Sequence, residues 1–60
     1  MTGDDYYLKA IAGARKSDKT LMSTALTRAV QMDGTIRDRA KADLEFRKMW
    51  KSPEFNAAIK

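Results

Sequence analysis

Few side chains in this sequence could carry out chemistry. His and Cys are both absent from its 60 residues, which removes the commonest general base, the commonest metal ligands and the thiol nucleophile. Ser17, Thr35 and Ser52 stand where helix capping explains their hydroxyls, and no candidate base has an obvious relation to Ser23 in mid-helix. We therefore expect neither nucleophilic catalysis nor a metal site.

The acidic residues and the glycines support the same expectation. Eight Asp and Glu residues are present, and they fall at predicted helix starts or in i,i+4 pairs. A two-carboxylate acid–base pair stays open as an alternative, but no spacing favours it. Gly3, Gly13 and Gly34 are too far apart for a phosphate-binding loop. The sequence thus predicts no catalytic residue, no cofactor-binding residue and no bound metal.

Composition bounds the class of protein. Hydrophobic residues make up 43% and charged residues 33% of the chain, which is typical of a globular rather than a disordered protein. No apolar stretch approaches the roughly 20 residues needed to cross a bilayer. Residues 1–5 are acidic where a signal peptide is basic, so we expect a soluble protein whose targeting segment, if one exists, lies outside this chain. Residues 1–60 are expected to form one small helical domain.

The first predicted helix covers residues 4–16, with Thr2 or Asp4 as its cap. Its apolar residues follow a helical spacing of i, i+4 and i+7: Tyr7, Ile11 and Ala14. Gly13 costs about 1 kcal/mol relative to Ala inside a helix. A glycine at such a position often marks the close approach of another backbone, and we expect that here.

The second predicted helix covers residues 19–32 and follows a break and cap at Ser17 and Asp18. Its apolar residues form a single stripe: Met22, Ala25, Leu26, Ala29 and Val30. Asp33 and Gly34 end it, and Gly34 is expected in the left-handed conformation.

The remaining chain is predicted to form short helices. Thr35 reads as a cap, and Asp38 three residues later resembles the partner in a capping box. The apolar arc shifts between residues 36–44 and 46–50, which predicts a break near Asp43 and two helices over residues 36–42 and 44–51. Ser52, Pro53 and Glu54 start the last helix. The large aromatic residues are expected in the core: Phe46, Trp50 and Phe55. Together with Leu44, they are expected to cover the hairpin.

This order of elements resembles the end of a tetratricopeptide repeat (TPR) protein. Residues 6–34 are similar to one repeat, with these residues at its characteristic positions: Tyr6, Ala10, Leu26, Ala29 and Gly34. Three positions depart from the family's pattern: Lys9, Gly13 and Met22. Residues 42–46, Trp50 and residues 52–55 look like the closing helices of bacterial repeat proteins, including envelope-associated proteins of the Bacteroidetes type. The expected fold is all-α, a helical hairpin (residues 4–34) followed by closing helices (residues 35–60).

The resemblance implies a non-enzymatic scaffold for protein–protein interaction, the terminal repeat of a larger protein with further repeats before it. Its groove-facing positions, carried over from the family, would be Asp4, Tyr7, Ile11 and Arg15. Two alternatives stay open. Tyr7 and Ile11 could instead be core residues, and Asp4 and Arg15 could simply complement the helix dipole. The partner would be a protein or peptide that the sequence does not identify.

A second class of function is a small basic domain of helix-turn-helix type that binds nucleic acid. The net charge is +4, and Arg37, Lys41, Lys48 and Lys51 would share one side of a continuous helix. Acidic residues interleave with them and the predicted break destroys the alignment, so we expect only weak, nonspecific binding to nucleic acid. We also expect weak self-association through apolar side chains left exposed on the first helix.

Overall fold

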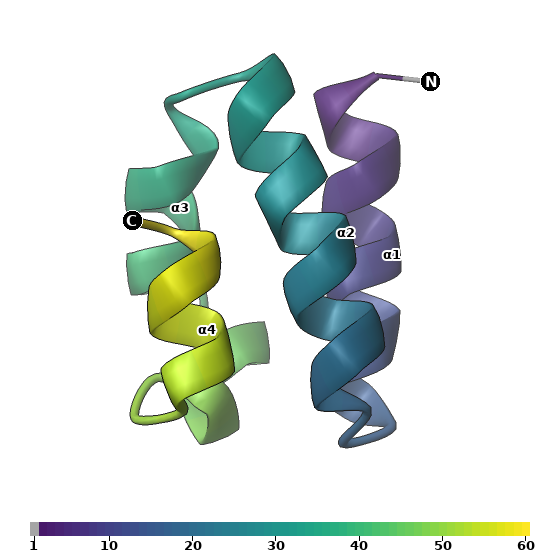
Figure 1. The fold of residues 1–60 in the computed structure, drawn as a ribbon, viewed down its shortest axis with the longest axis vertical. Helices are drawn as coiled ribbons and strands as arrows, with labels where there is room; N and C mark the ends of the chain where they lie inside the picture. Colours follow the sequence, from purple (N-terminus) through teal and green to yellow (C-terminus); the bar gives the residue numbers. More distant parts are fainter. Residues whose placement is uncertain (1) are drawn as a thin grey trace.

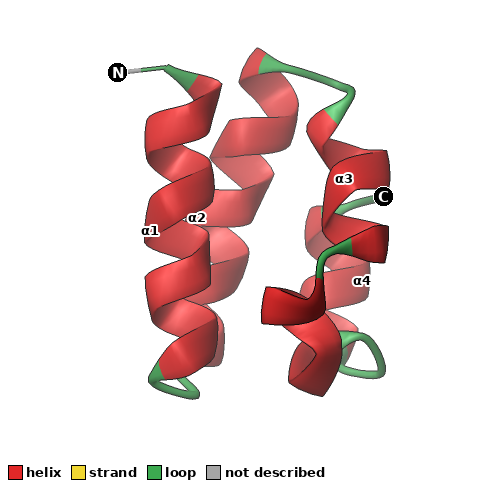
Figure 2. Cartoon of the chain, turned by 180° about the vertical axis from the view of Figure 1, so that it is seen from behind, coloured by secondary structure: helices red, strands yellow, loops and turns green. Residues whose placement is uncertain are grey.

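The structure is a computed structural model that describes residues 2–60. Over this range every regular element is helical, and no strand occurs (Figures 1 and 2). The elements are α1 (Gly3–Arg15), α2 (Lys19–Met32), α3 (Ile36–Ala42), the 3₁₀ helix η1 (Leu44–Met49) and α4 (Pro53–Ala58). The all-α prediction is confirmed, and the predicted helix bounds agree with the observed ones to within two residues.

The helices form two layers. The helices α1 and α2 run antiparallel, side by side, and make the first layer. The shorter elements α3, η1 and α4 make the second layer, with α4 packed on α2 and η1 packed on α1 (Figure 2). None of the helices over residues 2–60 has both the length and the apolar character that a membrane crossing requires.

The first two helices begin at side-chain caps. Thr2 and Asp5 form a reciprocal capping box, in which each side chain accepts a hydrogen bond from the other residue's backbone NH. Asp18 caps α2 by accepting from the backbone NH of Leu21 at 3.0 Å. These contacts satisfy backbone donors that would otherwise lack a partner at the helix starts.

The two long helices come very close together at Gly13. A Cβ atom built on Gly13 would lie 2.6 Å from the backbone nitrogen of Met22 and 2.9 Å from its Cα. Only glycine fits such a separation, which confirms the expected close approach of a second backbone. The turn that follows α1 depends on Ser17, whose φ is +58°, and not on a glycine.

The predicted chemistry of the turn between α2 and α3 is wrong in two respects. Gly34 does not adopt the left-handed conformation, since no glycine in residues 2–60 has a positive φ. Thr35 does not cap α3; its backbone NH and its hydroxyl both donate to the carboxylate of Asp33, at 3.0 and 2.7 Å. The Asp33 side chain thus orders this turn in place of the expected glycine and threonine.

The break near Asp43 is confirmed. Asp43 is extended (φ −84°, ψ 119°), separates α3 from η1, and accepts from the backbone NH of Glu45 at 3.0 Å. Residues 44–49 form a 3₁₀ helix, which is tighter than the α-helix expected for residues 44–51. Ser52 caps α4 as expected, with Pro53 at the first helical position.

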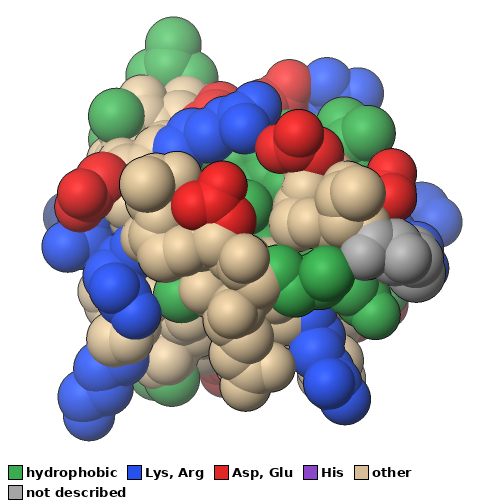
Figure 3. All heavy atoms as spheres, turned by 90° about the horizontal axis from the view of Figure 1, so that it is seen from above, with side chains coloured by type: hydrophobic (Ala, Val, Ile, Leu, Met, Phe, Trp, Pro, Cys, Tyr) green, Lys and Arg blue, Asp and Glu red, His purple; other side chains and the backbone are tan. Residues whose placement is uncertain are grey.

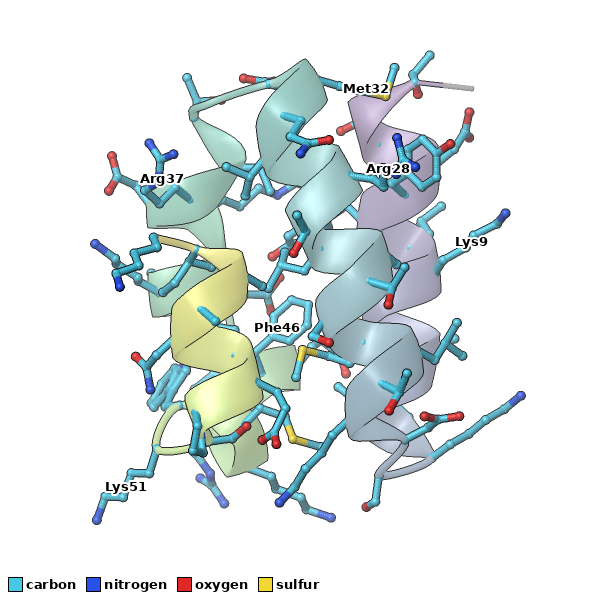
Figure 4. All side chains as sticks on the ribbon, viewed as in Figure 1. Lys9, Arg28, Met32, Arg37, Phe46 and Lys51 are labelled. Carbon is cyan, nitrogen blue, oxygen red and sulfur yellow. The ribbon has the colours of Figure 1, made fainter. Side chains whose placement is uncertain are left out.

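The core lies between the two layers, and Phe46 points into it from η1 (Figure 4). The rings of Tyr7 and Phe46 meet edge to face, and Phe46 also contacts the ring of Phe55, with both centroid separations at 5.5 Å. The largest fully buried side chains come from both layers: Tyr7, Met22, Leu26, Ile36, Phe46 and Phe55. The core placement of Phe46 and Phe55 is therefore confirmed.

Two closing-helix residues lie differently from expectation. Trp50 is only partly buried, and it packs on the edge of the core while its indole NH donates to the Ala40 carbonyl at 3.3 Å. Leu44, which we expected to cover the hairpin, is 73% exposed. Phe46 and Met49 are the buried residues of η1, and with three residues per turn they share one side of it while Leu44 lies about 120° away.

Candidate interaction surface between α1 and η1

The structure brings only two of the four proposed partner-binding residues to one place. Ile11 is half-buried and Arg15 is exposed, and both line the same hollow on the surface. Asp4 is exposed near the opposite end of α1, where it pairs with Arg39 at 3.3 Å. Tyr7 is only 1% exposed, which agrees with the alternative that it is a core residue.

Inside the molecule, Tyr7 holds the side chain of Asp43 in place. Its hydroxyl donates to Asp43 at 2.6 Å, and the Arg39 guanidinium lies 4.5 Å above its ring. Burial and the neighbouring carboxylate raise the pKa of the Tyr7 hydroxyl far above its ordinary value. This phenol stays protonated and holds Asp43 in place, so it is unsuited to act as a general base or nucleophile.

A surface hollow of about 410 Å³ lies beside α1, and a second of about 280 Å³ adjoins it over η1. Arg15 and Glu45 line both, so this ion pair marks the boundary between them. The pair is bidentate: the guanidinium Nε donates to one carboxylate oxygen at 3.0 Å and an outer nitrogen donates to the other at 2.5 Å. We call the two hollows together the α1/η1 groove.

Apolar side chains flank the ion pair. Leu8 from α1 is 65% exposed and Leu44 from η1 is 73% exposed, although both are large and aliphatic. Further apolar residues complete the walls: Ile11, Ala12 and Ala14. An apolar lining with a few charged groups is typical of a site that binds another molecule.

The charges at the groove are predominantly positive. Four cationic side chains line it, against the single carboxylate of Glu45: Arg15, Lys16, Arg47 and Lys48. The hydrogen bonds from Arg15 hold the pKa of Glu45 below its ordinary value, so this carboxylate is ionised at neutral pH. The far end of the molecule differs, because basic and acidic side chains alternate there (Figure 3).

Two hydroxyl groups and the acidic side chains are the other polar groups of interest. Within residues 2–60, no three acidic side chains gather closely enough to hold a metal ion. Ser23 hydrogen-bonds to the backbone carbonyl of Thr20 at 3.3 Å, and Ser52 bonds to Glu54 at 2.8 Å next to its capping contact. Both hydroxyls therefore have local structural partners.

Comparison with protein-family models, curated proteins and solved structures found no match. The groove itself is therefore the basis for a functional proposal. The sequence identified only part of this groove, because it did not single out Leu8 or Leu44 as exposed apolar residues. The signal for Leu8 is present in the sequence: it stands one position beyond Tyr7, about 100° away from the buried stripe.

Proposed function

We propose that this chain is a non-enzymatic protein-interaction module that binds a segment of a partner protein in the α1/η1 groove. One observation carries the proposal: Leu8 and Leu44 are exposed on the two sides of a groove between two elements. A chain of 60 residues has little apolar area to spare from its core. Two large aliphatic side chains placed together outside that core favour a binding surface.

The energetics suit a binding role. Full burial of a leucine side chain contributes about 1.5–3 kcal/mol, so covering Leu8 and Leu44 would supply a useful part of a moderate binding free energy. The groove wall is also fixed in advance. Asp43 joins the start of η1 to α1 through the hydrogen bond from the Tyr7 hydroxyl. A preorganised wall reduces the entropy lost on binding.

The resemblance to a terminal TPR repeat supports the same class of function. The antiparallel α1 and α2, with their close approach at Gly13, are compatible with a repeat hairpin. Ile11 and Arg15, two of the four groove positions carried over from the family, line the α1/η1 groove. In a longer protein a preceding repeat could compete for α1. We assign the groove to a separate partner because η1, and not α1 alone, forms half of it.

Nucleic-acid binding is the weaker proposal. The basic stripe that motivated it requires a continuous helix through residues 36–51, and the chain changes direction at Asp43. Arg37 and Lys41 belong to α3, whereas Lys48 belongs to η1. Interleaved acids on the far end of the molecule weaken a phosphate-tracking surface further (Figure 3).

Peptide selection tests the proposal. A displayed library of random peptides is selected against the wild-type chain, and the recovered clones are tested against the double variant Leu8→Ser, Leu44→Ser. The control is Met32→Ser, because Met32 is 52% exposed at the far end of α2 (Figure 4). We expect most clones to lose at least tenfold in affinity for the double variant and to bind the control normally. Clones that bind both variants equally would place the binding surface elsewhere and contradict the proposal.

A further inference from the structure

Resting on this proposed function, we infer that the partner segment is an acidic amphipathic helix. Its apolar side chains would cover Leu8 and Leu44, and its carboxylates would face the basic rim of the α1/η1 groove. The inference concerns the chemistry of the partner, which the exposed leucines alone leave open.

The charges that line the groove favour an acidic partner. Four cationic groups and one carboxylate line the groove, which leaves an excess of three positive charges around an apolar floor. A partner with Glu or Asp beside its apolar residues would gain from all four cations, and a basic partner would be repelled. The excess is local, since acidic and basic groups alternate at the far end of the molecule (Figure 3).

The shape of the groove fits a helix. On α1 the lining of the two hollows runs from Leu8 to Lys16, and the hollows adjoin at the Arg15–Glu45 pair. Eight helical steps rise about 12 Å, so the central two turns of a partner helix of about 14 residues would cover this stretch. An amphipathic helix of that size places apolar side chains at i, i+3, i+4 and i+7 on one face, as groove binding requires.

Glu45 has a specific place in this scheme. Its carboxylate already accepts two hydrogen bonds from the guanidinium of Arg15, in the position that a partner carboxylate would take. The two side chains are 38% and 67% exposed, and exposed ion pairs of this kind contribute little to stability. A partner carboxylate can therefore displace Glu45 at small cost, so Glu45 acts as an internal competitor for the acidic partner.

Three synthetic helices test the inference. Each has about 14 residues and the same leucine stripe, and the polar positions are all Glu in the first, all Gln in the second and all Lys in the third. Each carries a fluorescent label for anisotropy titration at low and at physiological salt. We expect the Glu peptide to bind at least tenfold more tightly than the Gln peptide, the Lys peptide to bind most weakly, and salt to reduce the difference.

Single substitutions locate the effect. Glu45→Gln should raise affinity for the Glu peptide severalfold and leave the Gln peptide nearly unchanged. Lys48→Gln should lower affinity for the Glu peptide. Lys51→Gln removes the same charge from a residue that does not line the groove and points away from the molecule, so its effect should be clearly smaller (Figure 4).

The outcomes separate the two proposals. Equal binding of the Glu and Gln peptides, lost in the Leu8→Ser, Leu44→Ser variant, would overturn the acidic partner and leave the proposed function standing. Failure of all three peptides and of the peptide selection would overturn both. A DNA duplex that displaced the Glu peptide at lower concentration than the unlabelled peptide itself would overturn the inference in favour of nucleic acid.

Discussion

The Tyr7 hydroxyl donates a hydrogen bond of 2.6 Å to the carboxylate of Asp43, 36 residues further along the chain. The other oxygen of that carboxylate accepts from the backbone NH of Glu45 at the start of η1. One side chain therefore connects the middle of α1 to the point where the chain leaves α3. Because η1 begins there, this contact fixes where Leu44 and Glu45 lie relative to α1.

Removing the hydroxyl should loosen that connection without emptying the core. In Tyr7→Phe the ring still packs against Phe46, so the expected loss is that of one partly buried hydrogen bond, about 1 kcal/mol in the free energy of unfolding. The expected signature is local: amide hydrogen exchange should accelerate in η1 more than in α2. Urea denaturation and exchange measured by NMR check both points, and an unchanged exchange rate in η1 would contradict the role given to this bond.

Stability should fall in acid, and the sign follows from Asp43. Its pKa lies below the ordinary value of 3.8, mainly because the Tyr7 hydroxyl donates to it. As the pH falls, the unfolded chain takes up this proton before the folded chain does, so the folded state loses relative stability. The free energy of unfolding should therefore decrease from about pH 5 downward through the lowered pKa.

Urea titrations at several pH values measure this dependence. Asp43→Asn should show a flatter profile than the wild type, whereas Asp38→Asn removes an exposed carboxylate from α3 and serves as the control. The hydrogen bonds to Asp5, Asp33 and Glu45 lower their pKa values too, so part of the acid dependence should persist in both variants. A profile of Asp43→Asn that matches the wild type would contradict the assignment.

The contact at Gly13 predicts opposite results for two glycine substitutions. Gly13→Ala places a methyl group 2.6 Å from the backbone of Met22, so we expect a loss of about 1–3 kcal/mol despite the better helix propensity of Ala. Gly34→Ala meets nothing within 4 Å and needs no positive φ, so it should be neutral or stabilise by up to about 1 kcal/mol. Thermal unfolding of both variants decides the matter, and equal effects would show that the helices are not this close.

The aromatic residues of the second layer should differ in importance. Phe46 is fully buried, and Phe46→Ala should cost about 3–5 kcal/mol, enough to unfold much of so small a domain. Trp50→Ala should cost less, because Trp50 is only partly buried. Urea unfolding of both variants, followed by circular dichroism, measures the two losses in the free energy of unfolding. A larger loss for Trp50→Ala than for Phe46→Ala would contradict this prediction. Trp50 emission should also lie at shorter wavelength in the folded chain than in denaturant.

The sequence predicted the helices well because their signals are local. The cap at Asp18, the stripe of α2 and the change of apolar face before Phe46 each depend on residues close in the chain. The predicted conformation of Gly34 is wrong for a related reason. Asp33 supplies a side-chain acceptor that orders the turn in an ordinary conformation, and this local contact competes with the left-handed glycine that usually ends a helix.

The groove was harder to predict because it depends on contacts between distant residues. The pair of Arg15 and Glu45 joins residues 30 apart, and Leu44 is exposed because η1 packs with Phe46 and Met49 turned inward. At 100° per residue Leu44 and Phe46 lie about 200° apart, so a helix that buries Phe46 turns Leu44 away from the core. Gly13 and Met22, two of the three residues that depart from the TPR pattern, lie directly against each other.

The most direct test of the proposed function is amide NMR mapping of the labelled wild-type chain with the best peptide from the selection. If the α1/η1 groove is the binding surface, the largest shifts should cluster at Leu8, Ile11, Arg15 and residues 44–48. The amides of α4 and of the turn at residues 33–35 should stay nearly unchanged. Shifts centred on α4 or on that turn, with α1 and η1 unaffected, would contradict the proposal.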